Sequence, residues 1–214
     1  MVLYDYWRSS ASYRVRIALN LKGLSYEQKS VHLVRDGGEQ KKPEYLAINP
    51  QGLVPALIDR GVVLTQSMAI MEYLDERYPD PALMPVDATG RARVRAMALV
   101  VACDIHPLNN SSVTGYLGST LSQSAAAVNQ WYCHWISRGF AALESLLEDS
   151  GTSGSCCFGD EPGFADICLV PQVYNAERFN CDLAPYGNIR RISSYCRGLK
   201  AFTMAAPENQ PDAD

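Results

Sequence analysis

The hydroxyl-rich segment Ser9-Ser10-Ala11-Ser12 has the residue types and the position best suited to chemistry in this sequence. It joins an apolar segment, residues 2–7, to a cationic segment with a helical pattern that ends near Gly23. A helix that begins here has backbone N–H groups without helical partners and the positive end of its dipole in its first turn. With the hydroxyls of Ser9 and Ser10 as further donors, the turn could bind an anion. On this segment alone, simple helix capping by either serine is the favoured interpretation.

Two later motifs could complete such a site. Val54-Pro55 begins an apolar strand, where a cis peptide bond would turn the main chain outward and let Val54 pair with an extended peptide. Gln66-Ser67 precedes a second helical pattern, where Ser67 either caps the helix or binds a carboxylate together with the amide of Gln66. Taken singly, each motif favours the ordinary structural role.

The elements that position these motifs are expected to form an α/β domain over residues 1–80. Strands are predicted at residues 2–7, 26–33, 54–58 and 62–65, and helices at 12–22, 42–48 and 67–78. Asp59-Arg60-Gly61 has the composition of a hairpin turn. The resulting order, β-α-β-α-β-β-α, predicts a compact unit with a mixed sheet.

The remainder of the chain is predicted to be helical. Prolines at positions 79, 81 and 85 indicate a stiff linker over residues 79–85. Amphipathic patterns at residues 91–109, 124–148, 164–178 and 188–197 predict an all-α bundle as the second domain, residues 86–214. The polar segment Pro207–Asp214 is expected to be a mobile tail.

Composition excludes several classes of function. The net charge of −4 argues against nucleic acid as a partner. We find no apolar run of membrane length and no secretion signal, so a cytoplasmic location is expected. Three separated histidines give no metal-ligand spacing.

The cysteines are expected to be reduced. Their number, seven, is odd and no C-x-x-C motif occurs, which is typical of free thiols rather than of a disulfide framework. Five of them are scattered singly and are predicted to be small buried hydrophobic residues: Cys103, Cys133, Cys168, Cys181 and Cys196.

Together, the three motifs resemble the glutathione site of glutathione transferases. The segment Arg8–Leu19 is similar to the signature of the zeta class, which includes maleylacetoacetate and maleylpyruvate isomerases. Further segments typical of that class extend over almost the whole chain, at Asn49-Pro50-Gln51, Gly159-Asp160-Glu161, Ala165-Asp166, Val170–Val173 and Ala176–Phe179. The resemblance implies a thioredoxin-like glutathione-binding domain followed by an all-α substrate-binding domain, and a homodimer.

The sequence departs from the class at two positions. Ala11 stands where the class usually has cysteine, so no protein thiol can take part at that position. Gly163 stands where the class usually has Ser or Thr at the start of a helix, and Asp166 is expected to reach back to the Gly163 N–H. Because glycine at an N-cap costs only a few tenths of a kcal/mol relative to serine, we expect the fold to persist.

Site residues follow from the resemblance. Glutathione is implied as the cofactor, held by Ser9, Ser10, Gln40, Gln51, Val54, Pro55, Gln66, Ser67, His106 and Asn110. Ser9, Ser10 and Arg8 are the implied catalytic residues. Arg8 and Arg178 would bind the carboxylates of a substrate, since the arginine fork suits a carboxylate. A solvated charge remains the alternative for Arg178, and a hydrogen bond at a helix bend near Pro107 is the alternative for His106.

The implied function is a glutathione-dependent cis-trans isomerisation of a maleyl-type keto diacid in aromatic catabolism. By resemblance to the class, a thiolate adds to the cis double bond, the new single bond rotates, and loss of the sulfur leaves the fumaryl isomer. Maleylpyruvate is slightly favoured over maleylacetoacetate. Two alternatives stay open: a glutathione transferase or dehalogenase acting on small α-halo acids, and a non-catalytic transferase-like scaffold.

Overall fold

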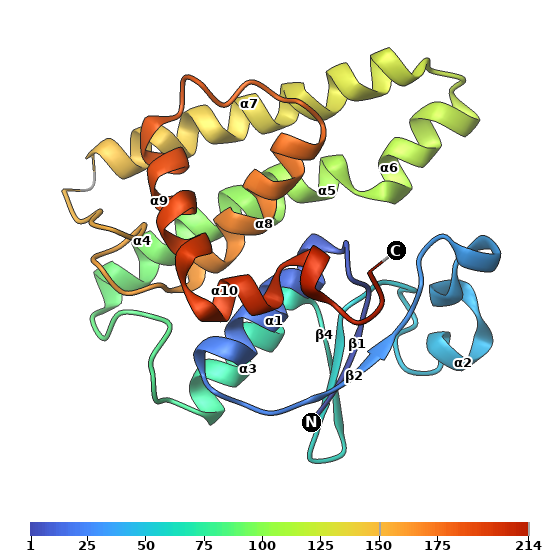
Figure 1. The fold of residues 1–214 in the computed structure, drawn as a ribbon, viewed down its shortest axis with the longest axis horizontal. Coiled ribbons are helices and arrows are strands. Elements are labelled where there is room, and N and C mark those ends of the chain that lie inside the picture. The colour runs from blue at the N-terminus through green and yellow to red at the C-terminus, as the bar shows by residue number, and fades with distance from the viewer. Residues whose placement is uncertain (150, 214) are drawn as a thin grey trace. The chain divides into compact units, whose positions relative to one another are not determined.

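A four-stranded mixed sheet organises the N-terminal part of the computed structural model, which describes residues 1–149 and 151–213 (Figure 1). The strands are β1 (Val2–Asp5), β2 (Glu27–Ser30), β3 (Ala56–Asp59) and β4 (Val62–Thr65), in the order β2-β1-β3-β4. β2 is parallel to β1, whereas β3 is antiparallel to both β1 and β4. The predicted mixed sheet and the order of its elements are confirmed.

Helices α1 (Ser10–Leu21), α2 (Pro43–Leu46) and α3 (Ser67–Arg77) accompany the sheet, with short 3-10 turns at Arg35–Gly37 and Glu39–Lys41. α1 packs against α3. The apolar positions of β1, α1, β3 and α3 form the core, and Leu3, Ile17, Leu57 and Ile70 are fully buried. Burial of such side chains is the main stabilising contribution, about 1.5–3 kcal/mol each.

The β3–β4 hairpin turns as its sequence predicts. Arg60 and Gly61 both have positive φ, 50° and 81°. Two successive positive values match the twist of the flanking strands and favour glycine at the second position. The observed bounds of β4 equal those predicted.

The second unit, Met84–Arg197, is helical, as predicted. Its helices are α4 (Ala88–Leu99), α5 (His106–Asn109), α6 (Ser111–Gly115), α7 (Ala125–Asp149), α8 (Phe164–Arg178) and α9 (Gly187–Gly198). The last residue of α9, Gly198, lies one position past the end of this unit. Two π-helical turns are also present, at Val100–Ile105 and Tyr116–Thr120. The single helix predicted over residues 91–109 is therefore interrupted. The π-helical turn ends just before Pro107, whose missing N–H and ring disfavour an uninterrupted α-helix.

The buried side chain of Asp166 anchors the start of α8. Its carboxylate accepts hydrogen bonds from the backbone N–H of Gly163 (2.9 Å) and of Cys157 (2.8 Å). The contact expected between Asp166 and Gly163 is confirmed. Burial raises the pKa of the Asp166 carboxyl group, and the two backbone N–H donors oppose that shift.

The C-terminal segment corrects the expected domain division. Residues from Gly198 onward, including α10 (Lys200–Ala205) and a 3-10 turn at Pro207–Asn209, belong to the first unit together with Met1–Leu83. α10 packs against α1 (Figure 1). The expected mobile tail is also wrong for residues 207–213, because Gln210 is buried and Asp212 makes hydrogen bonds to the main body of this unit. Asp214 lies outside the described residues.

Two of the cysteines form a disulfide. Cys133 on α7 is bonded to Cys181, just after α8, and their Cα atoms are 5.2 Å apart. The expectation that both are free thiols is therefore wrong, because a contact across 48 residues leaves no trace in local spacing. Cys103 is exposed rather than buried, whereas Cys168 and Cys196 are buried as expected. Among the described helices, none is long and apolar enough to cross a membrane.

Candidate functional site

The turn between β1 and α1 presents the two serines at the start of the helix. Ser9 occupies the N-cap position, where its Oγ accepts a hydrogen bond from the Ser12 N–H (3.2 Å). Its own N–H donates to the Tyr6 carbonyl (3.0 Å), which closes the turn. Ser10 is the first helical residue and is buried. Capping by Ser9 still leaves its hydroxyl proton as a donor, so capping and ligand binding are compatible.

Arg8 supplies a positive charge beside these serines. Its Nη2 donates to the hydroxyl of Tyr6 (3.2 Å), and its guanidinium carbon lies 4.7 Å from the centre of the Trp7 ring. The side chain is half-buried. Contacts with two aromatic rings hold the cation close to the turn without neutralising it.

The Val54–Pro55 peptide bond is cis, the conformation in which the sequence would let Val54 pair with an extended peptide. Val54 is buried and lies just before β3. The preceding carbonyl, of Leu53, accepts hydrogen bonds from the Tyr45 hydroxyl and from the Asn49 amide, both at 2.6 Å. Burial raises the pKa of Tyr45 to about 12, so that its hydroxyl stays protonated and can donate. These contacts fix the main chain that enters Val54.

Ser67 is the first residue of α3, and Gln66 occupies the cap position with φ 68°. The prediction that Ser67 might cap this helix is therefore wrong. Its hydroxyl instead accepts a hydrogen bond from Nη1 of Arg14 (3.3 Å), which is buried. A serine hydroxyl, the N-terminus of α3 and a guanidinium group thus lie together, a combination that suits a carboxylate.

Gln51 and Gln66 are brought together by the fold. The amide Nε2 of Gln66 donates to Oε1 of Gln51 (2.8 Å), and both side chains are exposed. Gln40 is half-buried and donates to the Leu33 carbonyl (3.3 Å). A Cβ on Gly52, which has φ 62°, would lie 3.1 Å from the Gln40 carbonyl, so the chain at Gln40 passes close to the Gln51 loop.

Arg14 and Arg16 are residues that the analysis of the sequence missed. Both lie on α1 and are buried, with Arg16 fully inaccessible. Buried arginines are rare unless the charge is paired with an opposite charge or satisfied by hydrogen bonds. The feature of the sequence that could have identified them is a pair of arginines, separated by one residue, within a helical pattern that is otherwise largely apolar.

The other three predicted site residues lie in the second unit. His106 is half-buried at the first position of α5. Asn110 caps α6, because its Oδ1 accepts from the N–H and the hydroxyl of Ser112, both at 2.9 Å. Arg178 is exposed at the end of α8, and its guanidinium lies 4.9 Å from the centre of the Phe179 ring.

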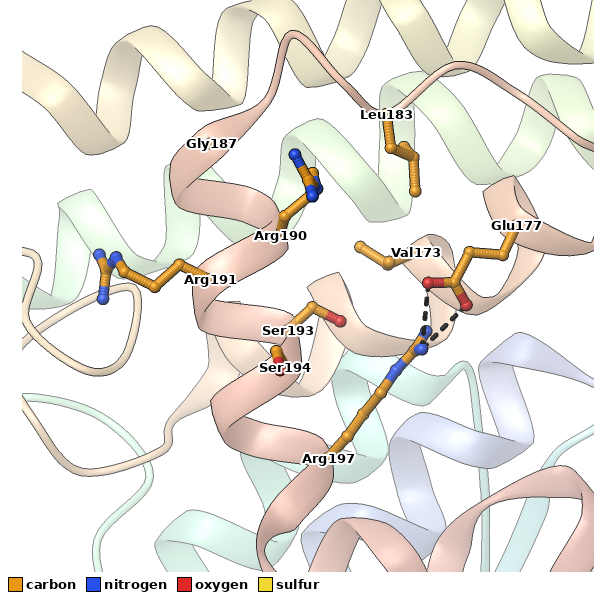
Figure 2. Close-up of a pocket in the computed structure, with 9 residues that line it drawn as sticks. All are labelled: Val173, Glu177, Leu183, Gly187, Arg190, Arg191, Ser193, Ser194 and Arg197. Atoms are coloured by element: carbon orange, nitrogen blue, oxygen red, sulfur yellow. Dashed lines mark hydrogen bonds and ion pairs between the residues drawn. The ribbon is translucent and has the colours of Figure 1, made fainter.

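A separate cavity of about 600 Å³ lies within the second unit (Figure 2). It is lined by Val173, Glu177, Leu183, Gly187, Arg190, Arg191, Ser193, Ser194 and Arg197. Nη1 of Arg197 contacts both oxygens of the Glu177 carboxylate (2.8 and 3.1 Å), and Arg191 donates to the Gly154 carbonyl (2.6 Å). None of the predicted site residues lines this cavity.

Comparisons with known proteins decide the family. Residues 1–76 match the N-terminal domain of glutathione S-transferases. A probable maleylacetoacetate isomerase of Vibrio cholerae is 52% identical over 213 residues, which cover 100% of this chain and 98% of that protein. The holo structure of maleyl pyruvate isomerase, a bacterial zeta-class glutathione S-transferase, superposes with a TM-score of 0.97 at 52% identity and covers 100% of both chains. The chain belongs to the zeta class of glutathione transferases.

Zeta-class membership confirms the fold class expected from the sequence. A maleylacetoacetate isomerase from Methylobacterium extorquens, solved with malonate and glutathione, is 40% identical and superposes with a TM-score of 0.95 over 100% of both chains. Relatives named for either maleyl acid are thus similar to this zeta-class chain over their full length.

Proposed function

We propose that this protein catalyses the glutathione-dependent cis-trans isomerisation of a maleyl-type keto diacid. The observation that carries the proposal is the start of α1, where the hydroxyls of Ser9 and Ser10 and the cation of Arg8 meet a helix N-terminus. Support also comes from the names of the relatives, which are maleyl acid isomerases.

The residues of the first unit fit glutathione, a peptide with a thiol and two carboxylates. Ser67, supported by Arg14, suits a carboxylate at the N-terminus of α3, and the Gln51–Gln66 pair offers amide groups beside it. Val54 and Pro55 precede a strand and suit an extended peptide. We assign the remaining contacts to Gln40 and, from the second unit, to His106 and Asn110.

Ser9 and Ser10 would stabilise the negatively charged form of the sulfur. When bound, glutathione supplies a thiolate that adds reversibly to the cis double bond. A thiol with an ordinary pKa of about 8.5 is about 3% ionised at pH 7, so full ionisation gains at most about 30-fold. The larger contribution must therefore come from holding the substrate in position.

Arg8 and Arg178 are proposed to perform this positioning. Each guanidinium can bind a carboxylate in two-point fashion, and each can stabilise negative charge that develops on the substrate. Ala11 leaves the hydroxyls and the helix dipole, with no protein thiol, to hold the sulfur.

We assign most of the glutathione contacts to the first unit and the substrate pocket to the helical unit, and we propose a cytoplasmic homodimer. Bacterial relatives named for maleylacetoacetate and for maleylpyruvate are equally similar to the chain, at 52–53% identity, so an assay with both acids must decide between the two substrates.

An isomerase assay with both maleyl acids, with and without glutathione, tests the proposal. The Ser9→Ala, Ser10→Ala double variant should lose up to about 30-fold in kcat/KM, because thiolate stabilisation is removed. Ser145→Ala, on the exposed face of α7, is the matched control. Wild-type rates in the double variant would refute the assignment of the serines.

The same assay separates the two alternatives. Conjugation of glutathione to a small α-halo acid without isomerisation would indicate a transferase or dehalogenase. Binding to immobilised glutathione without turnover of either substrate class would indicate a scaffold.

A further inference from the structure

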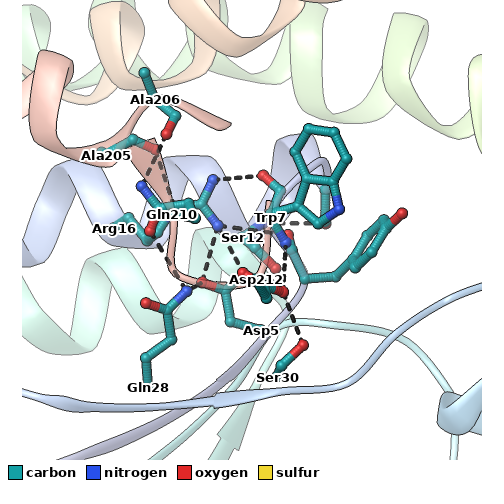
Figure 3. Close-up of polar contacts among 12 residues, drawn as sticks. Asp5, Trp7, Ser12, Arg16, Gln28, Ser30, Ala205, Ala206, Gln210 and Asp212 are labelled. Atoms are coloured by element: carbon teal, nitrogen blue, oxygen red, sulfur yellow. Dashed lines mark hydrogen bonds and ion pairs between the residues drawn. The ribbon is translucent and has the colours of Figure 1, made fainter. Parts of the chain in front are cut away.

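A buried ion pair joins Asp5 to Arg16, on the two elements that flank the turn with Ser9 and Ser10 (Figure 3). Nη1 of Arg16 lies 2.8 Å from both carboxylate oxygens of Asp5, and both side chains are fully inaccessible. Asp5 ends β1, and Arg16 lies in the second turn of α1. The pair therefore joins the strand before the turn to the helix after it.

The remaining donors of Arg16 hold main-chain carbonyls. Nη2 donates to the Trp7 carbonyl (2.9 Å), Nη1 donates to the Tyr6 carbonyl (3.4 Å), and Nε donates to the Ala205 carbonyl at the end of α10 (2.9 Å). One guanidinium group thus links the turn, through its own backbone, to the C-terminal segment. Such a fork is rigid, and lysine could not reproduce it.

Residues 207–213, here called the C-terminal strap, approach the same turn from outside the core. Oδ2 of Asp212 accepts hydrogen bonds from the Trp7 N–H (3.3 Å) and from the Ser30 hydroxyl (2.7 Å). Gln210 anchors the strap, because its Nε2 donates to the carbonyls of Met204 (2.9 Å) and Ala206 (2.8 Å). Both peptide groups of Trp7 are therefore held, one by Asp212 at the Trp7 N–H and the next by Arg16 at the Trp7 carbonyl.

We infer that Arg16 and Asp212 are positioning residues for the thiol-binding turn, an inference that rests on the proposed function. Neither is assigned a contact with glutathione. They fix the backbone of residues 6–9, and through it the direction of the Ser9 hydroxyl and of the first N–H groups of α1. Sites of this kind lose binding and rate when their supporting groups allow a shift of about 1 Å.

Asp212→Ala is the variant that tests the inference, because Asp212 is near the chain end and lies outside the core. Glu208→Ala, which removes the same charge from an exposed position of the strap, is the matched control. Asp212→Asn retains an acceptor oxygen and is the conservative rescue variant. Ser30→Ala removes the second partner of Asp212 and should weaken its hold on Trp7 without touching the turn.

In the free protein, amide hydrogen exchange at Trp7 should be faster in Asp212→Ala than in Glu208→Ala. With glutathione, the dissociation constant measured by calorimetry should rise about three- to tenfold, as expected from the loss of one ordinary hydrogen bond. The pKa of the bound thiol, followed by thiolate absorbance, should move upward. Asp212→Asn should recover most of each effect, and Ser30→Ala should show part of it.

A purely structural strap would lower the thermal midpoint of Asp212→Ala while leaving Trp7 exchange and the bound thiol pKa of the folded protein unchanged, and this outcome would overturn the inference. Identical results for the Asp212→Ala and Glu208→Ala variants in every measurement would also overturn the inference. If the Ser9, Ser10 double variant still loses activity in either case, the proposed function stands and only the positioning role fails. Wild-type rates in the double variant would instead refute the assignment of the serines, and a wild-type protein without glutathione-dependent isomerisation would remove the proposed function.

Discussion

Ser67 has a different role in the structure from the helix cap that local sequence favours. Local sequence allows it to be a helix cap, but the cap position is taken by Gln66, and the hydroxyl faces a guanidinium 53 positions earlier in the chain. The motif that marks the site could be predicted, because it depends on residue types and order. Arg14 could not be assigned to it, since only the packing of α1 against α3 brings the two residues together.

Ser67→Ala should therefore weaken glutathione binding without weakening α3. Because Ser67 is not the cap, α3 should persist, and loss of the buried hydrogen bond from Arg14 should lower the free energy of unfolding by about 1–3 kcal/mol. Loss of a hydroxyl donor to a carboxylate should raise the dissociation constant for glutathione about tenfold. Calorimetric binding and chemical unfolding measure the two quantities.

Ser111→Ala is the matched control, since Ser111 is the exposed first residue of α6. Equal glutathione affinities for the two variants would contradict a carboxylate site at Ser67.

At the scale of elements, strongly periodic segments were predictable and interruptions were not. The bounds of β4 and α8 equal those expected, since turn residues and a capping aspartate mark their ends. Pro107 disfavours a continuous helix after α4, and the π-helical turn there packs against α7, a contact that local sequence does not show. A Cβ at Gly139 on α7 would overlap the side chain of Ile105, so α7 approaches the π-helical turn closely at this point.

Gly139→Ala should destabilise the protein by about 1–3 kcal/mol, because the added methyl group overfills a packed contact. Gly115→Ala, on α6 with open space around its Cβ, should be neutral or stabilise by up to about 1 kcal/mol through helix propensity. Denaturant unfolding of the two variants gives the comparison. A destabilisation of Gly115→Ala as large as that of Gly139→Ala would contradict the close approach.

At the scale of the whole molecule, the division of the chain was only partly predictable. The change from mixed to helical patterns near residue 80 separates the two units correctly. The polar composition of the last residues is the same for a free tail and for a strap, because hydrogen bonds to distant residues such as Trp7 and Ser30 do not show in it.

The Cys133–Cys181 disulfide gives a prediction at the same scale. Purified protein unfolded without reductant should show five free thiols, and seven after reduction. The closed loop spans 48 residues, so on the chain-entropy account the bond adds about 4 kcal/mol to the free energy of unfolding. Thiol titration and denaturant unfolding, each with and without reductant, measure the two effects.

Cys103→Ser is the control for the thiol count, since this exposed cysteine is free and its loss should reduce each count by one. Seven thiols in the unreduced, air-exposed protein would contradict the disulfide. In a reducing cytoplasm, the two cysteines would also stay unbonded.

The return of the C-terminal segment to the first unit sets an order for biosynthesis. During translation, Met1–Leu83 emerges early but lacks α10 and the partners of Arg16 and Trp7 that only the last residues supply. The helical unit, by contrast, is continuous in sequence and can be complete before the chain is released. A premature stop codon just after Arg197 would thus spare the helical unit and damage the unit that was made first.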